Sequence, residues 1–233
     1  KQRYLELIRD SSVLLAQLVN DTLDLSMIES HKVTLSSRPI KADGLVDGVV
    51  TAVRASADAK HLDFRVEENG EDAGYFLGDR LRIQKIVLNL LSNAVKFTPE
   101  GGSVALTLDF EPLDEEHLGL DMTVADSGEG MAPEFVPHVF EPFVQENANE
   151  SVRYMGTGLG LSILKRIVDM MDGTVDVSSV QGEGTTFEVH LVFPRLVDYV
   201  PDPVEDAPAL STLAGTRVLL VDDHPLNLEL ARQ

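Results

Sequence analysis

The sequence contains neither cysteine nor tryptophan among its 233 residues. Without cysteine the chain can form no disulfide and no thiolate metal site, which fits a reducing compartment. It also has no apolar run long enough to span a bilayer, and its first residues show no signal-peptide pattern. Because the chain begins with Lys1 rather than methionine, we interpret it as a cytoplasmic fragment of a longer protein.

Basic residues are scarce: 19 Lys and Arg stand against 39 Asp and Glu, which gives a net charge of −20. This balance argues against a nucleic-acid-binding protein, because phosphate backbones require a basic surface. An acidic protein can still bind an anionic nucleotide where a metal ion, a lysine or a helix N-terminus supplies local positive charge.

Hydrophobic periodicity predicts an α+β fold. Residues 1–30 carry apolar residues at helical spacing and predict one long helix that packs against another helix. Later helices are expected to end near Lys60, to run from about Asp79 to Pro99, and to follow Gly160. Strands are expected at 32–40, 62–68, 74–78, 103–110, 118–127 and 184–193. Without a regular βαβ alternation, we expect a two-layer sandwich in which helices cover one face of a mixed sheet.

The C-terminal part changes in composition. Residues 194–215 hold four prolines and four acidic residues, which predicts a linker. After it, Val218–Val221 reads as a buried strand that is followed directly by Asp222 and Asp223, and we interpret this as the start of a further domain.

The stretch "NLLSNAVKFT", residues 89–98, places Asn89 and Asn93 on one face of an otherwise apolar helix. Asparagine is a mediocre helix former and is costly to bury without partners. Its amide oxygen suits Mg²⁺, which takes its other ligands from phosphates and water. Lys96, on much the same face, could meet phosphate as a point charge. Taken alone, the stretch is better explained as a helix with satisfied amides.

Three glycine-containing stretches follow. In "VADSGEGM", Asp126 at a strand end could accept a hydrogen bond from an exocyclic amine such as that of adenine, although a plain turn has the same composition. "GTGLGL", residues 156–161, leads into a helix N-terminus that can cradle an anion, yet it matches neither GxGxxG nor a P-loop. Phe140–Phe143 could anchor a mobile lid before it. "GEGTTF", residues 182–187, alone predicts only a hairpin turn.

Together and in this order, these stretches resemble the motifs of bacterial-type hybrid sensor histidine kinases. Residues 89–98 resemble the N box, 126–131 the G1 box, 140–143 the F box, 156–161 the G2 box, and 182–187 the last glycine box. The resemblance implies the histidine-kinase/gyrase-type ATPase fold. It also implies four parts: the second helix of a dimerisation and phosphoacceptor hairpin (1–31), a catalytic ATP-binding domain (32–195), a linker (196–215) and a truncated receiver domain (216–233).

The same resemblance implies ATP and Mg²⁺ as cofactors. It assigns the metal to Asn93 and Asn89, phosphate to Lys96, and a catalytic role to all three. Further ATP contacts are implied for residues that flank the adenine, line the lid or close over the triphosphate: Phe97, Asp126, Gly128, Gly130, Arg153, Tyr154, Gly156, Thr157, Gly158, Leu159, Gly160 and Thr185.

By this resemblance, the γ-phosphoryl group passes to a histidine on the dimerisation helix and is relayed to an aspartate. The accepting histidine and the receiver's acceptor aspartate are both absent from this sequence, so we expect no autophosphorylation. The implied partners are the protein's own hairpin and receiver, a downstream phosphotransfer or response-regulator protein, and a second copy in a full-length homodimer. An anchor in the inner membrane stays open for the full-length protein.

Two other functions stay open. A pseudokinase that serves as an interaction module would fit two departures from the family: Met155, where another glycine is frequent, and Glu129, where an apolar or small residue is frequent. An ATP-hydrolysing relative of the same fold would need a glutamate in place of Asn89, because an amide cannot take a proton at neutral pH.

Overall fold

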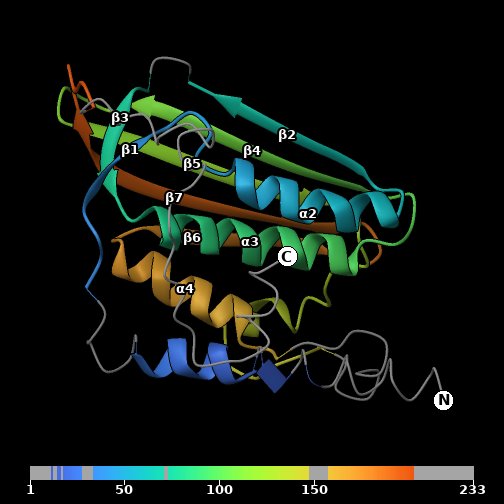
Figure 1. Cartoon of the computed structure of the whole chain (residues 1–233). Coiled ribbons are helices and arrows are strands. Elements are labelled where there is room, and N and C mark those ends of the chain that lie inside the picture. The colour runs from blue at the N-terminus through green and yellow to red at the C-terminus, as the bar shows by residue number, and fades with distance from the viewer. Residues whose placement is uncertain are drawn as a thin grey trace, which may run out of the picture. The chain divides into compact units, whose positions relative to one another are not determined.

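The computed structural model describes residues 12, 15–16, 18–27, 34–70, 73–146 and 157–201. The chain divides into two compact units, Lys1–Val197 and Asp198–Gln233, and nearly all described residues belong to the first. Its elements (Figure 1) are β1 (Arg38–Lys41), α2 (Asp47–Ala59), β2 (Asp63–Asn69), β3 (Tyr75–Gly78), α3 (Arg80–Phe97), β4 (Ser103–Pro112), β5 (His117–Asp126), the 3₁₀ turn η1 (Val136–His138), α4 (Gly160–Met170), β6 (Thr174–Val180) and β7 (Gly184–Leu196).

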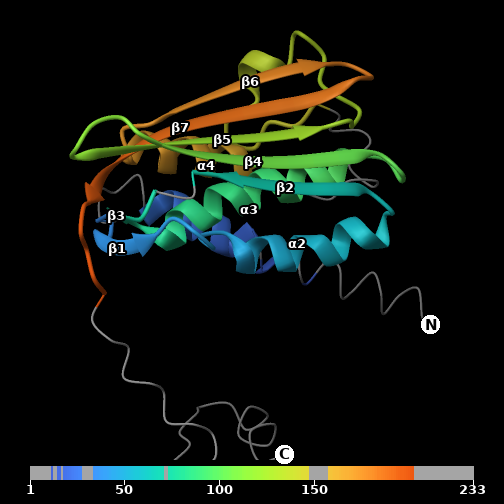
Figure 2. The ribbon, with the colours of Figure 1, turned by 90° about the horizontal axis from the view of Figure 1, so that it is seen from above.

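A seven-stranded sheet forms one layer, in the order β1-β3-β7-β5-β4-β2, with β6 paired to β7. The β2–β4 pair is parallel and the other pairs are antiparallel, so the sheet is mixed. Figure 2 shows α2, α3 and α4 together on one face of this sheet. The predicted two-layer α+β architecture is therefore confirmed.

Alternating apolar residues explain the central strands. In β4, Val104, Leu106 and Leu108 are buried, whereas the residues between them are more exposed. Successive strand side chains point to opposite faces, so a period of two buries one face under the helices. The strands β5 and β7 repeat the pattern through Leu118, Leu120, Met122, Val124, Phe187, Val189, Leu191 and Phe193.

Helix α3 is the central helix, and its ends lie where the sequence predicted. The Asp79 side chain caps its start by accepting a hydrogen bond from the Arg82 N–H at 3.1 Å. At the other end, the Thr98 hydroxyl donates to the Ala94 carbonyl at 2.6 Å, just before Pro99. Its buried residues recur every three or four positions: Ile83, Ile86, Val87, Leu90, Leu91, Ala94 and Val95.

Two strand predictions were wrong in detail. Strand β1 covers 38–41, so only residues 38–40 of the predicted strand 32–40 pair with the sheet; 34–37 have no regular structure, and 32–33 lie outside the described residues. Strand β6 was not predicted, because most of its residues are polar; in the described part of the chain it pairs only with β7.

The N-terminal helix was predicted over residues 1–30, and the structure describes it as helical over 18–27. Leu25 is buried in the domain core, whereas Leu15, Val19, Leu23 and Met27 are each at least half exposed. These four described apolar side chains therefore stay largely uncovered. Among the described residues, no helix has both the length and the apolarity needed to cross a bilayer.

Candidate ATP-binding site

Asn89 joins two of the predicted motifs. Its amide nitrogen donates a hydrogen bond to the Gly160 carbonyl at 3.0 Å, and Gly160 is the first residue of α4. The two residues are 71 positions apart in the sequence, so the packing of α4 on α3 creates this contact. The N-box helix and the glycine loop therefore border one site.

Asn93 and Lys96 are half-buried on the same helix. Neither side chain has a hydrogen-bonding or carboxylate partner among the residues that the structure describes. The Lys96 ammonium lies 4.7 Å from the centre of the Phe97 ring, a cation–π arrangement. Burial lowers the pKa of Lys96 from its usual value. A half-buried ammonium without a counter-ion favours a bound anion.

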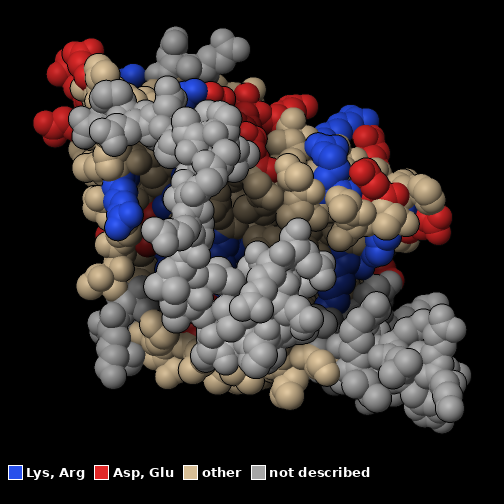
Figure 3. Space-filling view, in the orientation of Figure 1, with Lys and Arg blue, Asp and Glu red and all other residues tan. Residues whose placement is uncertain are grey.

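Local charge compensates for the acidity of the whole chain. Helix α3 holds four basic residues and no acidic residue: Arg80, Arg82, Lys85 and Lys96. Figure 3 shows Lys and Arg side chains in the recessed middle of the helical face, with Asp and Glu side chains along its upper edge. Lys85 pairs with Asp24, and Arg80 and Arg82 lie in the first turn of the helix, so Lys96 is the residue of α3 that can offer positive charge to an anionic nucleotide at the motif end.

Asp126 lies at the end of β5, opposite Thr185 of β7. Its carboxylate accepts a hydrogen bond from the Gly128 N–H at 2.8 Å and another from the Thr185 N–H. Burial raises the pKa of Asp126, and the two N–H donors offset only part of that rise. The carboxylate is thus held in a fixed orientation at the predicted adenine position.

The G1 loop is held against the β6–β7 hairpin. Gly130 has φ +62°, and a Cβ there would lie 2.0 Å from the Val180 carbonyl oxygen. Next to it, the Gly182 N–H donates to the Glu129 carbonyl at 2.7 Å, and the Glu129 N–H donates to the Phe97 carbonyl at 3.3 Å. The end of α3, the G1 loop and this hairpin therefore form one continuous wall.

Ser179 is a residue of this wall that sequence reasoning missed. Its hydroxyl accepts from the Met131 N–H at 2.9 Å and donates to the Gly184 carbonyl at 3.0 Å. It also lies 2.8 Å from the Thr185 hydroxyl. No motif pointed to Ser179, because the strand that carries it was not predicted.

The described part of the G2 box begins at Thr157. The Thr157 hydroxyl donates to the Asp21 carboxylate at 2.9 Å and accepts from the Leu159 N–H at 3.2 Å. The Leu159 side chain is fully buried, so only its backbone can face a ligand. Arg153, Tyr154 and Gly156 lie outside the described residues, as does Met155.

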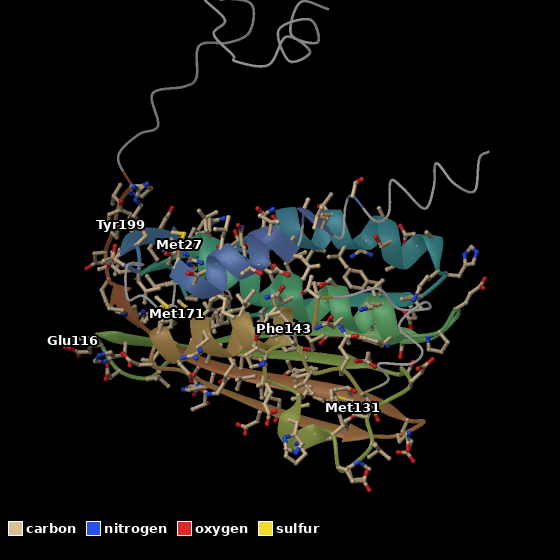
Figure 4. The ribbon with its side chains drawn as sticks, turned by 90° about the horizontal axis from the view of Figure 1, so that it is seen from below. Met27, Glu116, Met131, Phe143, Met171 and Tyr199 are labelled. Atoms are coloured by element: carbon tan, nitrogen blue, oxygen red, sulfur yellow. The ribbon has the colours of Figure 1, made fainter. Side chains whose placement is uncertain are left out.

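The F box meets the G2 box through backbone. The Phe143 N–H donates to the Gly158 carbonyl at 2.9 Å, and both residues have positive φ, 64° and 69°. Figure 4 shows Phe143 beside the N-terminal end of α4, and its side chain is 64% exposed. This backbone contact fixes the start of the predicted lid to the glycine loop.

The sequence and the fold both match known proteins. Residues 78–195 match the family model described as histidine kinase-, DNA gyrase B- and HSP90-like ATPase. The chain is 36% identical to the sensor histidine kinase GacS of Pseudomonas protegens over 99% of its own length and 24% of that protein. It is 33% identical to the autoinducer 2 sensor kinase/phosphatase LuxQ of Vibrio parahaemolyticus, over 97% and 27%. The chain therefore spans about a quarter of these curated relatives.

Solved structures agree. The crystal structure of full-length ShkA in complex with AMPPNP superposes with a TM-score of 0.70 at 31% identity, over 84% of this chain and 40% of that one. The mycobacterial sensor histidine kinase MprB gives a TM-score of 0.55 at 27% identity, over 69% and 99%. The resemblance and the fold class predicted from the sequence are thereby confirmed. The chain belongs to the family of histidine kinase-, DNA gyrase B- and HSP90-like ATPases.

Proposed function

We propose that the chain is the catalytic ATP-binding core of a hybrid sensor histidine kinase. The observation that carries this proposal is the pair formed by Asn93 and Lys96, two half-buried polar side chains without partners in the described part of the chain. A triphosphate would supply the anion that Lys96 lacks. Membership of an ATPase family and the names of the matched kinases support the same ligand.

Adenine would bind at the other end of the wall. The Asp126 carboxylate accepts two backbone N–H groups and keeps further acceptor capacity for an exocyclic amine. A Cβ at Gly128 would lie 2.6 Å from this carboxylate, and a Cβ at Gly130 would meet the Val180 carbonyl oxygen, so glycine at both positions keeps the wall beside Asp126 free of side chains. Thr185, whose hydroxyl lies close to Ser179, would line the adenine side.

The phosphates would lie between Lys96 and the N-terminus of α4. Free N–H groups and the helix dipole make a helix N-terminus favourable for anions. The Asn93 amide is unengaged in the described structure, and Asn89 commits only its nitrogen. Two amide oxygens therefore suit a Mg²⁺ ion that arrives with phosphates and water. Bound there, the ion would neutralise phosphate charge.

In this proposal the γ-phosphoryl group passes to a histidine on the dimerisation helix and then to an aspartate of a two-component phosphorelay. The residues described above position the nucleotide and offset its charge, which is most of what phosphoryl transfer requires. Hydrolysis is disfavoured because the Asn89 amide donates to Gly160 and offers no base to activate water. The proposed partners are the hairpin and receiver of the same protein, a downstream phosphotransfer or response-regulator protein, and a second copy.

Calorimetric titration with ATP tests the proposal, with and without Mg²⁺. We expect saturable binding that weakens when Mg²⁺ is removed or when Asn93 is replaced in Asn93→Ala. Asn69→Ala is the matched control, because the Asn69 amide bonds to Asp109 on the exposed side of the sheet. Flat heats from folded wild-type protein would contradict the kinase assignment and favour the pseudokinase alternative.

A further inference from the structure

Lys60 is the C-cap residue of α2, but its side chain forms hydrogen bonds with the end of α3. The ammonium group donates hydrogen bonds to the carbonyl oxygens of Val95 at 2.7 Å, Lys96 at 2.8 Å and Thr98 at 3.1 Å. An ammonium has three N–H donors, so these three carbonyls use all of them. Lys60 therefore acts as a side-chain cap on the C-terminus of the N-box helix.

The last carbonyl groups of an α-helix have no partner within the helix and carry the negative end of its dipole. In α3 each of them is satisfied. The Ala94 carbonyl accepts from the Thr98 backbone and hydroxyl, and the Phe97 carbonyl accepts from the Glu129 N–H. Lys60 satisfies the remaining ones, and it supplies the only charged donor among these groups in the described structure.

The carbonyls that Lys60 holds belong to the turn that presents the phosphate-binding side chain. Lys96 contributes a carbonyl to Lys60 and an ammonium that has no carboxylate partner among the described residues, and Phe97 lies under that ammonium. Lys60 also fixes the following loop, because its own carbonyl accepts the Gly101 N–H at 3.2 Å. We infer that Lys60 is a positioning residue for phosphate binding, which it controls through the backbone of residues 95–98.

This inference rests on the proposed ATP site, and it predicts a selective effect. Lys60→Met keeps the aliphatic stem and removes the three hydrogen bonds. The last turn of α3 then loses its cap, and the Lys96 ammonium loses its fixed position relative to the phosphates. The affinity for adenosine, which lacks phosphates, should fall less than the affinity for ATP, because Asp126 and Thr185 are held by hydrogen bonds that do not involve Lys60.

The test is to titrate ATP·Mg²⁺ and adenosine into wild type, Lys60→Met, Lys60→Arg and Lys41→Met, and to record the Tm of each. Lys41→Met is the matched control, because exposed Lys41 pairs with Asp43 on the loop after β1. We expect Lys60→Met to weaken ATP binding about tenfold and adenosine binding clearly less. Lys60→Arg, which restores a charged multiple donor, should recover part of the ATP affinity.

Equal losses for ATP and adenosine, or unchanged binding of both with a lower Tm, would show a purely structural role and overturn the inference. If Lys60→Met does not fold, Lys60→Gln, which keeps one donor group, is compared in the same way. Wild-type protein that binds no ATP would instead contradict the proposed function, so the two failures are distinguishable.

Discussion

The Asn89 amide nitrogen lies 3.0 Å from the Gly160 carbonyl oxygen, and this single hydrogen bond ties the N-box helix to the glycine loop. Asn89 therefore has a structural role besides any contact with a metal ion. The two roles use different atoms, because the amide nitrogen donates to Gly160 while the amide oxygen stays available as a ligand.

Asn89→Ala is expected to reduce both stability and nucleotide affinity. The half-buried Gly160 carbonyl would lose its donor, which should lower the free energy of unfolding by about 1–3 kcal/mol. Urea denaturation measures this change, and ATP titration measures the affinity. Ser92→Ala, an exposed change on the same helix, is the control. Unchanged stability in Asn89→Ala would mean that this hydrogen bond does not hold the two elements together.

Asp126→Asn is expected to separate stability from binding. Burial raises the Asp126 pKa in the folded chain, so the protonated form is favoured on folding. That contribution is complete below the usual pKa of 3.8 and is lost as the pH rises through the raised folded value. At neutral pH the ionised carboxylate is therefore a net cost, and the neutral amide should leave stability unchanged or higher by no more than about 1 kcal/mol.

ATP affinity should nevertheless fall at least about tenfold in Asp126→Asn. The new amide either points its NH₂ donor at the adenine amine or leaves that amine without an acceptor. In the wild type, affinity should also fall as the pH drops through the Asp126 pKa. Asp121→Asn is the control, since Asp121 pairs with His190 on the exposed side of the same strand. A clear fall in the free energy of unfolding of Asp126→Asn at neutral pH would contradict the conclusion that the ionised carboxylate destabilises the folded chain.

Lys96→Met is expected to weaken ATP binding by about 10- to 100-fold, the cost of a charged hydrogen bond, and to leave adenosine binding almost unchanged. Burial lowers the Lys96 pKa, so the charged form destabilises the folded state. That penalty is complete below the lowered pKa and vanishes as the pH rises past the usual 10.5. Melting at neutral pH should thus show no loss of Tm. The wild type should lose ATP affinity as alkaline pH neutralises Lys96.

Gly130→Ala and Gly182→Ala form a matched pair. Both glycines have positive φ, so alanine costs about 1–2 kcal/mol at each position. Only at Gly130 does the added Cβ also meet a backbone oxygen, at 2.0 Å, whereas nothing lies within 4 Å at Gly182. Gly130→Ala should therefore destabilise more and abolish adenine binding, while Gly182→Ala should keep it. Equal thermal shifts would mean that the G1 loop moves away from Val180 without cost.

Local signals account for what the sequence could predict. The ends of α3 were predictable because Asp79 and Pro99 act within one turn of the helix, and the central strands because their apolar residues alternate. Strand β6 was not, since the hydrogen bonds to β7 hold Thr174–Val180 in place without much apolar burial.

In the candidate site, too, local signals were predictable and long-range contacts were not. The residue types in the motifs predicted Asn93, Lys96 and Asp126, but not the side chains that support them. Lys60 acts on the Lys96 carbonyl from 36 positions away, and Ser179 acts on Met131 from 48. Such partners are set by strand register and helix packing, which no short stretch of sequence encodes. The domain boundaries and the residues that touch ATP stay predictions.

The Thr157 hydroxyl can donate one hydrogen bond, and in this structure it donates it to the Asp21 carboxylate of the N-terminal helix. A phosphate oxygen that took this proton would compete with Asp21, and the two negative charges would repel each other. If the nucleotide binds at this hydroxyl, as the proposed site implies, helix docking and nucleotide binding are thermodynamically linked with opposite sign. By reciprocity, the factor by which a docked helix weakens the nucleotide is the factor by which the nucleotide loosens the helix. In the proposed site, one hydroxyl group would thus couple the docking of the N-terminal helix to nucleotide occupancy.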